Sequence, residues 1–130
     1  MKDNYSAWDI HLEDFYQKKN GTERMFFLAR FGVLAPSSHN SQPWKFHIED
    51  NQILILTDRE RSLPMSDKNQ RQLFISIGCA IQNIITAAHY YSLEARIDYP
   101  DNNQTAARIT FVPQNDQSKP GEITIRAILT

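Results

Sequence analysis

Apolar residues recur at helical spacing in two stretches near the start of the chain. The first covers residues 5–16, with charged residues between the apolar ones, and predicts an amphipathic helix. Its apolar positions are Tyr5, Trp8, Leu12, Phe15 and Tyr16. The second covers residues 22–34 and is apolar almost all round, which predicts a deeply buried helix. Asn20 or Thr22 can cap this second helix.

A third helical pattern covers residues 68–91 and is the longest in the chain. It has a wide apolar stripe, and Ser66 or Asp67 can cap its first turn. The stripe consists of Phe74, Ile77, Ile81, Ile84, Ile85 and Ala88. Small residues around Gly78 and Cys79 allow a helix or a ligand to approach this element closely.

Strand patterns lie on either side of the long helix. Residues 44–49 alternate between apolar and polar side chains, and residues 53–57 form an apolar run after a short turn, so the two predict a hairpin. Residues 94–99 and 107–112 predict two more strands. An apolar pattern resumes over residues 122–130. Hairpins interleaved with helices indicate the α+β class, with a mainly antiparallel sheet packed against helices.

Composition excludes several classes of function. With 130 residues, the chain is expected to form one domain over residues 1–130, and its net charge of −1 favours neither a nucleic-acid nor a membrane partner. Cys79 is the only cysteine, so an internal disulfide cannot form and a reducing compartment is the simplest expectation. Because no signal peptide and no membrane-spanning apolar run is recognised, we expect a cytoplasmic protein. His39 has no cluster of ligand-type residues around it, so no metal site is expected.

The connection between the second helix and the first strand carries the strongest functional signal. Residues 36–44 read PSSHNSQPW, which is rich in hydroxyl and carboxamide groups and has a proline near each end. Such a loop can be a polar ligand site. It can also simply satisfy the backbone groups of the helix end and the strand. The loop has no positive charge, so it is a poor phosphate site by itself.

Two motifs of the chain resemble the nitroreductase superfamily of FMN-dependent enzymes. Residues 36–44 resemble the Pro-Ser-Ser-x-Asn-x-Gln-Pro-Trp loop of that family, and residues 77–88, IGCAIQNIITAA, resemble its Gly-x-Ala-x-Gln-Asn-Leu-x-x-Ala-Ala helix. The segment between them resembles the Acg-type branch of the superfamily. The matching residues there are Asp58, Arg59, Arg61, Leu63, Pro64, Asp67, Arg71, Gln72 and Leu73.

The resemblance implies a nitroreductase-like fold and a set of FMN contacts. By position, the cofactor-binding residues would be Pro36, Ser37, Ser38 and Asn40, with Gln42 in support. It also implies that NAD(P)H reduces the flavin, which then passes electrons to a nitroaromatic, a quinone or a similar acceptor. Because the flavin performs the chemistry, no catalytic side chain is expected. The partner would be a second copy of the chain, in an intertwined homodimer with FMN at the interface.

Other features depart from the family pattern. No Arg-x-Ser-x-Arg phosphate clamp is recognisable, and the second half of the family fold is absent, so the sequence resembles an N-terminal, incomplete copy of that fold. Arg71, with Arg59 and Arg61, is either a solvated charged segment or an anion clamp for FMN, NAD(P)H or a carboxylate. Two alternatives to an enzyme therefore stay open: a non-catalytic flavin-binding or dimerisation module, and an inactive remnant held by dimer packing.

Overall fold

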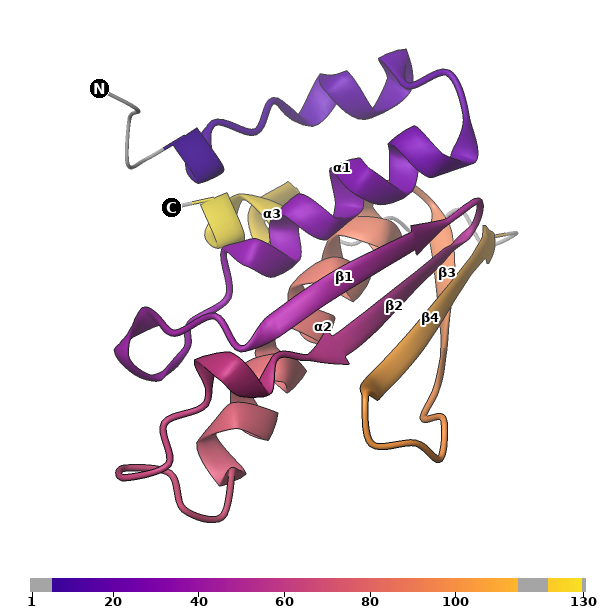
Figure 1. Ribbon diagram of the computed structural model, residues 1–130. Helices are drawn as coiled ribbons and strands as arrows, with labels where there is room; N and C mark the ends of the chain where they lie inside the picture. Colours follow the sequence, from indigo (N-terminus) through magenta and orange to yellow (C-terminus); the bar gives the residue numbers. More distant parts are fainter. Residues whose placement is uncertain (1–5, 115–121, 130) are drawn as a thin grey trace.

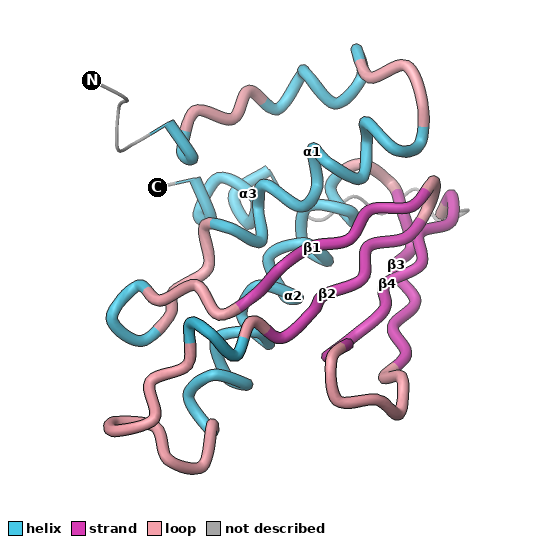
Figure 2. Tube along the Cα trace, in the orientation of Figure 1, coloured by secondary structure: helices cyan, strands magenta, loops and turns pink. Residues whose placement is uncertain are grey.

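The computed structural model describes residues 6–114 and 122–129. Its centre is a four-stranded sheet in the order β1-β2-β4-β3, in which every neighbouring pair is antiparallel. The strands are β1 (Trp44–Glu49), β2 (Gln52–Thr57), β3 (Leu93–Asp98) and β4 (Thr105–Pro113). The helices α1 (Gly21–Val33), α2 (Arg71–Tyr90) and α3 (Glu122–Leu129) pack on the sheet or on one another. The predicted α+β class and mainly antiparallel sheet are confirmed (Figures 1 and 2).

The core lies between one face of the sheet and the helices α1 and α2. Alternate strand residues, such as Ile53 and Ile55 of β2 and Ile109 of β4, are fully buried on this face. From the helices, Phe31 and Ile84 meet them with no exposed surface. Along β1, the buried or half-buried Trp44, Phe46 and Ile48 alternate with exposed polar residues, as the sequence pattern predicts.

Helix α1 begins where the sequence predicts it. The Asn20 side chain accepts a hydrogen bond from the backbone N–H of Glu23 at 2.9 Å, which caps the first turn. The expectation that this helix is buried almost all round is wrong at one position. Phe26 is 59% exposed. The segment before the helix packs on Phe27 through the ring of Phe15 and leaves Phe26 uncovered.

Helix α2 is held at its start by Asp67. The carboxylate of Asp67 accepts hydrogen bonds from the backbone N–H groups of Gln72 and Leu73 at 3.0 and 2.9 Å, so the predicted capping role is confirmed. By length and composition alone this 20-residue helix could cross a membrane. The core helix of a soluble protein passes the same test, and α2 packs against α1, β3 and α3.

The first segment differs from its prediction. Residues 6–17 form two short 3-10 helices, Ser6–Trp8 and Leu12–Gln17, instead of one amphipathic helix, and Tyr5 lies outside the described residues. The guanidinium of Arg30 donates a hydrogen bond to the carbonyl oxygen of Asp9 at 2.8 Å, between the two 3-10 helices. Packing against α1 therefore overrides the helical spacing, and Trp8 is left 42% exposed.

Candidate functional site

The loop after α1 is built from short polar contacts. The hydroxyl of Ser37 accepts a hydrogen bond from the backbone N–H of Gln42 at 3.0 Å, which closes the loop on itself. The Gln42 carboxamide donates to the side-chain oxygen of Asn40 at 3.1 Å. The family-like loop is therefore an organised turn in which two predicted site residues bond each other.

The backbone of this loop is strained. His39, Asn40 and Gln42 have φ angles of 54°, 52° and 49°, in the left-handed region that residues other than glycine rarely adopt. Asparagine tolerates this conformation better than most residues, because its short polar side chain bonds locally. Such strain persists only where the surrounding structure over-determines it, and it gathers at functional sites.

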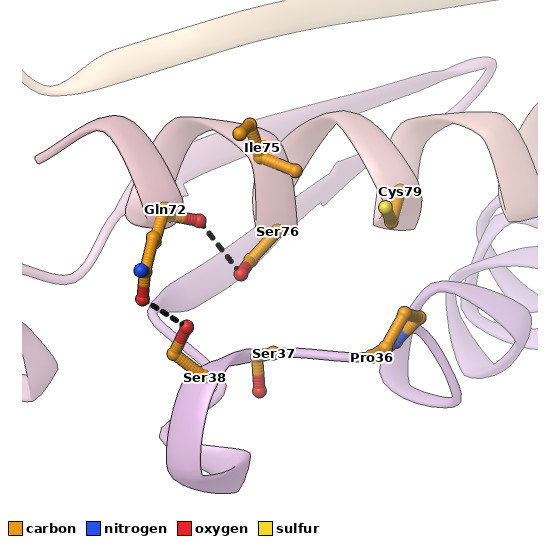
Figure 3. Close-up of a pocket in the computed structure, with 7 residues that line it drawn as sticks. All are labelled: Pro36, Ser37, Ser38, Gln72, Ile75, Ser76 and Cys79. Carbon is orange, nitrogen blue, oxygen red and sulfur yellow. Dashed lines mark hydrogen bonds between the residues drawn. The ribbon is translucent and has the colours of Figure 1, made fainter.

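A cleft separates this loop from helix α2 (Figure 3). It has a volume of about 330 Å³, and its loop wall consists of Pro36, Ser37 and Ser38. Its helix wall consists of Gln72, Ile75, Ser76 and Cys79, which follow one another at helical spacing on one side of α2. Of the small residues noted in the sequence around Gly78 and Cys79, Cys79 lies opposite the polar loop.

Two hydrogen bonds fix the polar groups of the cleft. The hydroxyl of Ser38 donates to the Oε1 atom of Gln72 at 2.5 Å, and this bond ties the loop to the helix (Figure 3). The hydroxyl of Ser76 donates to the backbone carbonyl of Gln72 at 2.8 Å, which keeps it close to its own helix. Further along α2, the Asn83 carboxamide donates to the carbonyl oxygen of Phe31 at 3.1 Å and anchors the end of α1 just before the loop.

The cleft brings together only part of the predicted site. Pro36, Ser37 and Ser38 line it, whereas Asn40 and Gln42 lie on the far part of the loop and bond each other. Arg71, the first residue of α2, is exposed and does not line the cleft. Gln72, Ser76 and Cys79 were missed as site residues, and their spacing on one helix face was the available signal. Cys79 is partly exposed because it borders this opening.

The chemical character of the cleft is neutral. Hydroxyl and carboxamide groups stand beside the apolar surfaces of Pro36, Ile75 and Cys79, and no cationic side chain lines the cleft among the described residues. These walls offer hydrogen bonds and apolar surface to a neutral part of a ligand. They do not suit a phosphate, because its recognition needs a cation or a cluster of backbone N–H groups.

Three cations are held by partners in or beside the segment between β2 and α2. Asp58 is 6% exposed, and its carboxylate lies 3.4 Å from Nε of Arg61 and 3.9 Å from Nζ of Lys45. Arg59 donates to the side chain of Gln70 at 2.7 Å. These contacts hold the Acg-like segment against the sheet, so Arg61 and Arg59 are engaged within the protein itself.

Sequence relatives support the resemblance proposed from the motifs. The chain is 33% identical over 86 residues to "Uncharacterized protein Rv3127" of Mycobacterium tuberculosis H37Rv, a match that covers 61% of the chain and 25% of the relative. It is 29% identical over 98 residues to "Putative NAD(P)H nitroreductase acg" of the same strain, covering 73% of the chain and 30% of the relative. The match thus spans about a quarter of the length of the curated relatives. No protein-family model matches the chain.

Solved structures share the fold. A "Putative NADH Oxidase" from Clostridium acetobutylicum aligns with a TM-score of 0.61 at 19% identity, over 76% of this chain and 81% of that chain. A "putative nitroreductase in complex with fmn" from Desulfovibrio desulfuricans aligns with a TM-score of 0.59 at 17% identity, over 88% of this chain and 94% of that chain. The chain has the nitroreductase fold, and its resemblance to the nitroreductase superfamily is confirmed. Among its sequence relatives is one of the Acg type.

Proposed function

We propose that the chain forms one wall of an FMN site in an oxidoreductase of the nitroreductase type. The observation that carries this proposal is the cleft between the family-like loop and α2, where Ser38 and Gln72 are joined by a hydrogen bond. Support also comes from a fold neighbour that was solved with FMN and from relatives named as NAD(P)H nitroreductases. When bound, FMN would supply the hydride and electron chemistry.

The residues of the cleft would hold and orient the flavin. The Gln72 amide and the Ser37 and Ser38 hydroxyls would meet its polar edge or its ribityl chain, while Pro36, Ile75 and Cys79 would cover its apolar body. Asn40 and Gln42 would keep the loop in its strained form. The phosphate would be bound elsewhere, for example by Arg71 or by a second copy of the chain in a homodimer. On this proposal the electrons come from NAD(P)H and go to a nitroaromatic, a quinone or a similar acceptor, in the cytoplasm.

Titration with FMN tests the binding step. We expect flavin fluorescence to change saturably on addition of the protein, and Ser38→Ala and Asn40→Ala to weaken binding by roughly twofold to tenfold each, the value of a neutral hydrogen bond. Ser66→Ala and Asn103→Ala, at exposed positions away from the cleft, are matched controls and should bind like the parent chain. Absence of any flavin signal on titration would contradict the proposal.

The second candidate is a non-catalytic flavin-binding or dimerisation module. It is favoured by one observation: no cationic side chain lines the cleft among the described residues. Anaerobic addition of NADPH or NADH to the FMN-loaded chain separates the two candidates. Bleaching of the flavin absorbance supports the oxidoreductase, whereas bound flavin that stays oxidised supports the module.

A further inference from the structure

A second cavity lies beside α1 and shares no residue with the cleft between the loop and α2. It has a volume of about 500 Å³, within the range of small-molecule sites, and lies between the end of the 3-10 helix Leu12–Gln17 and the outward face of α1. Figure 1 shows these two segments running side by side, joined by a short connection. Glu23, Phe26, Phe27 and Arg30 follow at helical spacing and form its α1 wall.

The charge of this cavity is predominantly positive. Lys18, Lys19 and Arg30 line it, against the single carboxylate of Glu23. That carboxylate already accepts a hydrogen bond from the backbone N–H of Lys19 at 2.7 Å. Among the described residues, no carboxylate lies within ion-pair distance of the three cations. The chain as a whole has a net charge of −1, so this is a local concentration of positive charge.

The cavity also has an aromatic wall. Phe26 is 59% exposed, although large apolar side chains are usually covered, and Phe27 is buried beneath it. The Nζ atom of Lys18 lies 5.9 Å from the centroid of the Phe27 ring, so the cation is held above the aromatic wall. An accessible ring beside unpaired ammonium groups suits a flat apolar molecule that carries a negative charge.

We propose that this cavity binds a small aromatic carboxylate. The ring of the ligand packs on Phe26, and its carboxylate accepts hydrogen bonds from the ammonium groups of Lys18 and Lys19. Arg30 also lines the cavity, where it donates to the carbonyl oxygen of Asp9 at 2.8 Å and adds positive charge to the site. Charge complementarity and the exposed ring select this occupant over a neutral or cationic one.

The test uses 2-naphthoate as the probe, titrated into the 130-residue chain and followed by amide chemical shifts in NMR spectra. We expect saturable shifts centred on residues 17–30. The uncharged analogue 2-naphthamide should bind about tenfold more weakly, because it lacks the charge-assisted hydrogen bonds. Equal affinity for the two probes, no saturation up to about 10 mM, or shifts centred on Ser38 and Gln72 would each overturn the proposal.

Variants locate the site without disturbing the fold. The double variant Lys18→Gln/Lys19→Gln should weaken 2-naphthoate at least tenfold, and Phe26→Ala should weaken it roughly fivefold. Lys68→Gln and Tyr99→Ala change an exposed cation and an exposed ring elsewhere, and should leave binding unchanged. Arg30 is left intact because it also anchors the first segment. Unchanged affinity in both cavity variants would overturn the proposal.

Discussion

At the scale of single residues, Tyr91 joins three parts of the structure. Its ring stacks on Phe15 with centroids 4.0 Å apart, and it meets Phe27 edge-on. Its hydroxyl donates to the carbonyl oxygen of Leu12 at 2.6 Å, across 79 positions of the sequence. Burial, with a smaller contribution from Tyr90, raises the pKa of Tyr91 far above its ordinary value. This residue therefore links the end of α2 to the segment before α1.

The raised pKa predicts a loss of stability in alkali. The folded state keeps the Tyr91 proton more strongly than the unfolded state, so its contribution is fully present below about pH 10 and is lost as pH rises above that value. We expect the urea midpoint to fall between pH 9 and 11 on this account. In Tyr91→Phe the fall should be smaller, and at pH 8 the variant should be less stable by about 1 kcal/mol, because the Leu12 carbonyl loses its donor.

Tyr99→Phe is the control for that measurement, since Tyr99 is 72% exposed. It should behave as the parent chain does at every pH. An alkaline fall in stability that is the same in Tyr91→Phe and in the parent chain would contradict the assignment to Tyr91.

At the scale of elements, the first turn of α1 lies directly against the tight turn that joins β1 and β2. A Cβ atom placed on Gly21 would overlap the backbone carbonyl oxygen of Asp50. The hydroxyl of Thr22 donates to the carboxylate of the same Asp50 at 3.2 Å. Because the obstacle is backbone and cannot rotate away, glycine is required there by close approach, and the helix start and the hairpin are positioned together.

Gly21→Ala should therefore destabilise the fold. We expect a loss of about 1–3 kcal/mol in the free energy of unfolding, the usual cost of overpacking, measured by urea denaturation. Gly78→Ala is the matched control within one chain, because no other described atom lies within 4 Å of its added Cβ. That variant should gain about 0.5–1 kcal/mol from helix propensity. Equal stability of the two variants would show that the turn at Asp50 moves to admit the new methyl group, and would contradict the requirement for glycine.

At the scale of the whole molecule, one face of α2 has no cover among the described residues. Phe74 and Ile75 are 49% and 54% exposed, and Ile75 also lines the cleft between the loop and α2. Their surface continues into the cleft that we propose as one wall of an FMN site. No cation that could bind the phosphate lines this cleft among the described residues. A second copy that covers this face would bury the two side chains and complete the site, as the proposed homodimer requires.

Light scattering after size exclusion tests this arrangement. We expect a dimer for the parent chain and a monomer for Phe74→Ser/Ile75→Ser, with weaker FMN binding in the monomer. Met65→Ser, at a position that is 88% exposed in the connecting segment, should stay dimeric. A monomeric parent chain that binds FMN with full affinity would contradict a site shared between copies.

The sequence by itself determined most of the helices and strands, and the resemblance of the loop at residues 36–44 to that of the nitroreductases. Helical and alternating periods report which side chains share one face of one element, so α1, α2 and the two hairpins were predicted close to their observed bounds. The capping roles of Asn20 and Asp67 were also predictable, because they depend on residues a few positions away.

Only the tertiary structure decided which part of the protein each helix face packs against. The first segment forms 3-10 turns because Arg30 and the aromatic core of α1 hold it, and Phe26 stays exposed because that segment stops short of it. The helix wall of the cleft is formed by Gln72, Ile75, Ser76 and Cys79, whereas Arg71, next to Gln72 in the sequence, is exposed and does not line it. One residue along a helix turns a side chain by about 100°, so the wall of the cleft depends on how α2 is rotated against the loop, which local sequence patterns do not encode.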